Sequence, residues 1–153
     1  MIPVRPFALS AALAICAAPA LTQETGDYFI VRDLSTGPGE AAASIRQYVE
    51  ADEDWLFLAE FPLKGGEVQA MKICYLPIGA DVFAAGLHVA AMMPCGNLAF
   101  YEEDGQARLA MLDLDYLTAL SPDPNVARAA ETAAPAFEEM LSTALGRDEA
   151  RAE

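Results

Sequence analysis

The dipeptide Asp104-Gly105, with an alternating segment on each side, constrains this chain more than any other feature of its sequence. Both central residues of a type I′ hairpin turn need positive φ angles, which Asp and Gly tolerate. With this dipeptide as the loop, large apolar side chains fall on one face of both strands, in the pairs Phe100–Leu109 and Leu98–Met111. Tyr101 then faces Arg108 on the other side. The sequence therefore predicts a half-buried hairpin over residues 96–114.

The remaining segments alternate between strand and helix patterns. Aromatic and β-branched runs predict strands at 27–33, 55–61 and 68–76. Apolar residues at helical spacing predict helices at 39–52 and 80–92. Asp123 and Pro124 are typical of an N-cap and a first helical position, so a last helix begins there and ends near Gly146. The order β-α-β-β-(short α)-β-β-α predicts an α+β fold, with a curved, mostly antiparallel sheet and its helices on one face.

Residues 1–20 have the pattern of a signal peptide. Arg5 precedes a short apolar run, and Ala18-Pro19-Ala20 is a small-x-small cleavage motif. Cys16 also gives a weak resemblance to a lipoprotein signal, but Ile15 is unfavourable before a lipidated cysteine. We therefore expect cleavage near Ala20, a periplasmic or secreted protein, a single domain over 21–146 and a charged, disordered tail over 147–153.

The charge of the chain narrows the classes of partner. The formal net charge is −14, and removal of residues 1–20, whose only charged side chain is Arg5, brings it to −15. A surface this acidic repels nucleic-acid phosphates and anionic lipid headgroups. We therefore expect neither nucleic-acid binding nor membrane binding.

Two cysteines, Cys74 and Cys95, remain once Cys16 leaves with the signal peptide. In an oxidising compartment such a pair is first interpreted as a disulfide. The bond requires the strands that carry the cysteines to be antiparallel, because only then do both sulfur atoms lie at one end of the sheet. A structural bond here stabilises the fold by roughly 3 kcal/mol. The alternative is a redox-active or sulfur-handling pair, although the spacing is not Cys-x-x-Cys.

A soft-metal site is a further alternative. His88, the single histidine, precedes Cys95, and Met92 and Met93 lie between them. Thiolate, thioether and imidazole ligands together suit Cu(I), and a haem site is possible with the same ligands. However, methionines at the end of an apolar segment more often fill gaps in a core.

Two short motifs resemble the family called domain of unknown function 302 (DUF 302). The first motif is similar to the family's Leu-Pro-Cys, strand, Tyr-Glu-x-x-Gly pattern and runs from Met92-Met93-Pro94-Cys95-Gly96 to Tyr101-Glu102-Glu103-Asp104-Gly105. The second motif is similar to the family's Cys-Asn-Pro turn, but without the Asn, and consists of Cys74-Tyr75-Leu76-Pro77. The resemblance implies a fold like that of the TATA-box-binding protein, β-α-β4-α. It implies no activity, and a shared fold transfers no DNA binding.

Motifs for catalysis are missing from the sequence. With one histidine and no Ser-His-Asp, phosphate-loop, nucleotide or zinc-protease pattern, we assign no catalytic residue and favour a non-catalytic protein over an enzyme without excluding the latter. The sequence favours a non-catalytic binding or accessory module that acts through the concave face of the sheet or an edge, with a Cys74–Cys95 disulfide and an unknown small ligand or protein partner. A homodimer through an exposed strand edge is a further expectation.

Overall fold

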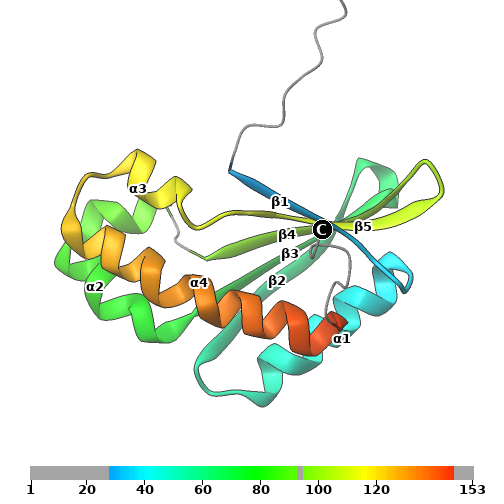
Figure 1. Cartoon of the computed structure of the whole chain (residues 1–153), viewed down its shortest axis with the longest axis horizontal. Coiled ribbons are helices and arrows are strands. Elements are labelled where there is room, and N and C mark those ends of the chain that lie inside the picture. The colour runs from blue at the N-terminus through cyan, green and yellow to red at the C-terminus, as the bar shows by residue number, and fades with distance from the viewer. Residues whose placement is uncertain (1–27, 93–94, 147–153) are drawn as a thin grey trace, which may run out of the picture.

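A computed structural model describes residues 28–92 and 95–146, in which five strands form one antiparallel sheet of order β1-β5-β4-β3-β2 (Figure 1). The predicted signal peptide and the predicted tail lie outside the described residues. In chain order the elements are β1 (Phe29–Asp33), α1 (Pro38–Ala51), β2 (Trp55–Leu63), η1 (Lys64–Gly66), β3 (Val68–Tyr75), η2 (Leu76–Ile78), α2 (Gly79–Ala84), η3 (Leu87–Met92), β4 (Gly96–Glu103), β5 (Gln106–Leu112), α3 (Tyr116–Leu120) and α4 (Pro124–Leu145), where η marks a 3₁₀ helix.

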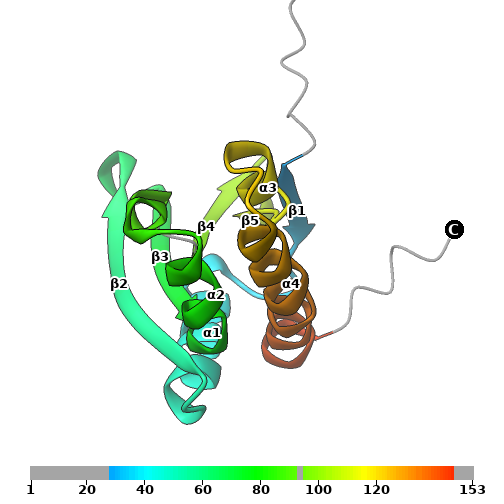
Figure 2. The ribbon, with the colours of Figure 1, turned by 90° about the vertical axis from the view of Figure 1, so that its left-hand side faces the viewer.

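The helices gather on one side of the sheet (Figures 1 and 2). Helix α1 contacts β2, β3, β4 and β5, and it also packs along α4. The core lies between this helical layer and the sheet, and its largest fully buried side chains include Phe100, Phe137, Ile45 and Met71. The predicted α+β class, with helices on one face of an antiparallel sheet, is confirmed.

The β4–β5 hairpin has the register predicted from its turn. Phe100 pairs with Leu109, Leu98 with Met111 and Tyr101 with Arg108. Asp104 and Gly105 have φ angles of 54° and 77°, as a type I′ turn requires. The turn thus decides which side chains of both strands enter the core.

Helix α4 begins as its cap residues predict. The side chain of Asp123 accepts a hydrogen bond from the backbone N–H of Asn125, and Pro124 is the first helical residue. The buried face of α4 consists of Val126, Ala129, Ala130, Ala133, Phe137, Met140 and Leu141.

Three segments differ from the sequence-based expectation. Strand β2 continues through Pro62 to Leu63. Proline is tolerated there because β2 is an edge strand, with a neighbouring strand on one side only. The segment expected as one helix over 80–92 consists of α2 and η3, separated near Gly86, whose φ of 119° is incompatible with an α-helix. The short helix α3 was not predicted from the sequence.

Candidate functional site

The two cysteines lie opposite each other on neighbouring antiparallel strands. The β3–β4 ladder runs to the pair Ile73–Gly96, and Cys74 and Cys95 occupy the next cross-strand position. Their sulfur atoms are 1.90 Å apart and their Cα atoms 4.3 Å apart. The geometric condition for a disulfide is therefore met, and the bond closes the crossover that contains α2 and η3.

Both cysteines are half-buried and belong to the side of the sheet that faces away from the helices. Lys72 shares this side with Cys74, two residues away on β3. Its Nζ donates a hydrogen bond of 2.9 Å to the side-chain oxygen of Asn97, and Asn97 Nδ2 donates one of 3.3 Å to the backbone oxygen of Cys95. A cationic side chain is thus connected to the cysteine pair through one amide.

The side chains expected to bind Cu(I) or haem do not form one site among the described residues. Cys95 is bonded to Cys74, so it offers no thiolate while the bond is intact. His88 is exposed, and its ring lies against Gly86, while Met92 is half-buried against the core. Met93 lies outside the described residues. Within the described ranges, no three His, Cys, Asp or Glu side chains group as a metal site. Metal or haem binding therefore stays a prediction that requires the cysteine pair to be reduced.

The side of the sheet that carries the cysteines, which we call the open face, is a second candidate surface. Because paired residues of antiparallel strands share a face, the ladder registers define its members: Leu56, Ala59, Phe61 and Leu63 on β2; Val68, Ala70, Lys72 and Cys74 on β3; Asn97, Ala99, Tyr101 and Glu103 on β4; Gln106, Arg108, Ala110 and Leu112 on β5; Phe29, Val31 and Asp33 on β1. Five large apolar side chains of the edge strands are 43–54% exposed there: Leu56, Phe61, Leu63, Phe29 and Val31.

One end of the open face carries a small ion-pair cluster. Arg108 Nε donates a hydrogen bond of 3.1 Å to Asp33, and Arg108 also pairs with Glu103. The hydrogen bond to Asp33 raises the pKa of Arg108. This guanidinium is therefore already matched by two carboxylates and does not act as a free anion-binding group.

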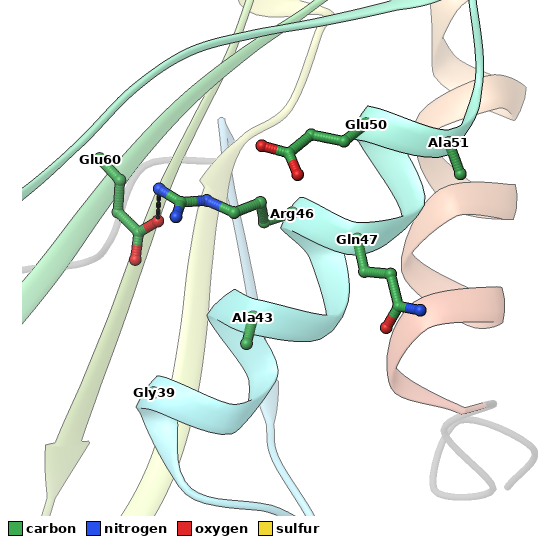
Figure 3. A pocket seen from close by; sticks show the side chains of 7 residues that line it. All are labelled: Gly39, Ala43, Arg46, Gln47, Glu50, Ala51 and Glu60. Atoms are coloured by element: carbon green, nitrogen blue, oxygen red, sulfur yellow. Dashed lines mark ion pairs between the residues drawn. The ribbon is translucent and has the colours of Figure 1, made fainter.

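A shallow groove lies between α1 and β2. It has a volume of about 370 Å³ (Figure 3) and is lined by Gly39, Ala43, Arg46, Gln47, Glu50, Ala51 and Glu60. Arg46 pairs with Glu60 and stacks on the ring of Phe57, 4.4 Å from its centroid. Because its only cationic side chain is already held in these contacts, this groove is a weaker candidate for ligand binding than the open face.

An aromatic cluster lies behind the cysteine pair, on the covered side. The ring of Trp55 contacts Tyr48, Tyr75 and Phe137 at centroid distances of 6.3, 5.0 and 4.8 Å. Burial, followed by the charges of Glu139 and Asp52, raises the pKa of Tyr48. These rings pack the core and do not reach the open face.

Sequence reasoning identified the cysteines but missed the open face as an apolar surface. The signal was present in the edge strands: Phe29-Ile30-Val31 and Leu56-Phe57-Leu58 are continuous apolar runs, whereas a half-solvated strand alternates. Such runs indicate that both faces of a strand are suited to burial.

Comparison with known proteins gives a family and a fold. A family model described as "Domain of unknown function DUF302" matches residues 35–144. A crystal structure of an uncharacterized conserved DUF302 protein from Bacillus stearothermophilus is similar to this chain, with a TM-score of 0.62 and 21% identity, covering 78% of this chain and 96% of that chain. No curated protein matches the chain. At this identity the structural likeness establishes the fold alone.

Proposed function

Because this chain belongs to the DUF302 family, whose function is unknown, we propose its function from its own surface: it is an exported, non-catalytic binding module that contacts its partner through the open face. The observation that carries this proposal is the exposure of five large apolar side chains on one face of the sheet. These side chains lie at the two edges of the face, and Ala70, Ala99 and Ala110 form an apolar row between them. Exposed apolar patches mark interaction sites.

The rigidity of the open face supports a binding role. The face is part of a five-stranded antiparallel sheet, and the Cys74–Cys95 bond joins the ends of its strands β3 and β4. A surface already fixed in its binding conformation loses little conformational entropy when it associates. The disulfide in this proposal maintains the surface and takes no part in chemistry.

Export is the first part of the proposal to test. The full chain is expressed in a bacterium with a periplasm, and the protein is recovered from each compartment. We expect a periplasmic product that begins at Leu21 and has no free thiol when titrated under denaturing conditions. A full-length cytoplasmic product with three reactive thiols would contradict export.

Site-specific photocrosslinking tests the binding surface. A photoreactive phenylalanine analogue replaces Phe61, which is 46% exposed on the open face, or Phe83, which is 57% exposed on α2 and serves as the matched control. In intact cells, position 61 is expected to give a discrete adduct that position 83 does not give. Equal labelling at both positions, or none at position 61, would reject the open face as the binding surface.

A second function, thiol–disulfide exchange, is favoured by the position of the cysteine pair on the open face near Lys72. Exchange with a dithiol protein would transfer two electrons, reduce the Cys74–Cys95 bond and form a disulfide in the partner, and a nearby cation favours the thiolate that results. The test is equilibration with glutathione buffers followed by thiol trapping. A pair that is reduced in the folded protein supports exchange, and a pair that is reduced only after unfolding rejects it.

A further inference from the structure

One cross-strand row of the open face has small side chains in the middle and larger ones at both margins. It reads Phe61, Ala70, Ala99, Ala110, Val31 from β2 to β1, and the rows on either side of it hold Lys72 with Asn97 and Tyr101 with Arg108. Small side chains along this row allow another sheet to approach toward the roughly 10 Å separation of packed sheets. The row can therefore receive an apolar surface.

The charge of the open face differs from that of the whole molecule. Its four charged residues, Lys72, Arg108, Asp33 and Glu103, sum to zero, whereas the chain carries −14. A basic partner would be drawn to the acidic surface elsewhere. The open face instead suits a partner that is apolar and neutral at the contact. Two copies of an acidic chain therefore repel each other less through this face than through the rest of their surface.

The size of the open face is sufficient for a small homodimer. Five strands at about 4.8 Å spacing and the seven residue-to-residue steps of the eight-residue strand β3, at about 3.3 Å each, give a face of about 24 by 23 Å. Two such faces bury on the order of 1,100 Å², which is above the roughly 1,000 Å² expected of a specific interface and at the weak end of the range.

The strand edges suit dimer formation less well than the face does. On the β2 edge, Pro62 lacks an N–H and the register shifts between Phe57 and Ala59, so the row of free backbone groups is interrupted. The β1 edge is only five residues long. Pairing through an edge would also leave the apolar side chains of the open face in water.

We propose that the open face is the interface of a symmetric homodimer, so that a second copy of this chain covers it. This inference rests on the proposed function, because it names the partner of the proposed binding surface. The dimer is weak and depends on protein concentration. Added salt strengthens it, because salt screens the repulsion between two copies that each carry a large negative charge.

Sedimentation equilibrium of the exported, oxidised protein over a range of concentrations tests the proposal. We expect a monomer–dimer equilibrium, with at least tenfold weaker association for Ala99→Arg, which places a charge at the centre of the open face. The matched control is Ala43→Arg in the exposed α1–β2 groove, which leaves association unchanged. Raising the salt concentration is expected to favour the dimer.

A second variant separates loss of association from loss of folding. Phe61→Asp changes a side chain that is already 46% exposed, so it removes the contact without opening the core. A protein that is monomeric at every concentration, or a dimer unaffected by both Ala99→Arg and Phe61→Asp, overturns the proposal. If the protein is monomeric and position 61 crosslinks to a different protein, the homodimer is rejected and the proposed function is kept. If the protein is monomeric and position 61 gives no adduct, both the homodimer and the proposed binding function are rejected.

Discussion

The two faces of the five-stranded sheet have similar strands and opposite surroundings. On the covered face, Phe100 and Leu109 are 0% exposed, and α1 packs against the strands β4 and β5 that carry them. On the open face, Phe61 and Val31 are about half exposed. One face therefore supplies the core that stabilises the fold, while the other retains apolar surface that the fold itself does not bury. The comparison teaches that apolar content alone does not separate a stabilising face from a binding face.

The largest expected effect separates the two faces directly. Phe100→Ala is expected to lower the free energy of unfolding by about 3 to 5 kcal/mol, because it leaves a cavity in a closed core. Phe61→Ala is expected to cost less than about 1 kcal/mol, because much of that ring is already in water. Urea denaturation at a protein concentration too low for association measures both. Equal losses for the two variants would contradict the comparison.

The disulfide is the exception on the open face, because there a bond and not burial stabilises the fold. The double variant Cys74→Ser with Cys95→Ser is expected to lower the free energy of unfolding by about 3 kcal/mol, since the unfolded chain is no longer constrained across a separation of 21 residues. The same denaturation experiment measures the loss, and wild-type protein unfolded with a reductant serves as the control. An unchanged midpoint would show that the bond contributes nothing to stability.

A glycine near the end of β4 tests how tightly the covered face is packed. A Cβ atom at Gly96 would lie 2.3 Å from Cε1 of Phe137, so Gly96→Ala is expected to cost about 1 to 3 kcal/mol through overpacking. Gly39→Ala in α1 meets nothing within 4 Å and is expected to change stability by less than about 1 kcal/mol, in the stabilising direction. Thermal unfolding of both variants decides the matter. A neutral Gly96→Ala would mean that Phe137 moves freely.

The smallest expected effect is a dependence on alkaline pH that arises on the covered side. Burial raises the pKa of Tyr116 above the usual 10.0, because desolvation disfavours the phenolate. The neutral phenol therefore stabilises the fold fully below about pH 10, and this stabilisation is lost as the pH rises through the pKa of the folded state. Tyr116→Phe is expected to lose less stability than wild type between pH 9 and 11. If the free energy of unfolding fell equally with pH in the two proteins, burial of the Tyr116 phenol would not be the source of the pH dependence.

The sequence was informative where a structure is specified by residues close together in the chain. The Asp104-Gly105 turn determined the β4–β5 register, and Asp123 with Pro124 determined the start of α4. The order of strand and helix patterns was enough for the fold class. The sequence also showed that only two cysteines, one possible pair, remain after the predicted signal-peptide cleavage. Whether those two can bond depended on the relative direction of the strands that carry them.

Tertiary structure decided which face of the sheet is covered and what the cysteines lie beside. The alternation in β4 and β5 predicts one buried face, but the edge strands are apolar on both sides, and only the packing of α1 and α4 leaves one of those sides in water. The contact between Gly96 and Phe137 likewise joins elements far apart in sequence. Turns and caps follow from local backbone preferences, whereas burial depends on which distant surfaces meet.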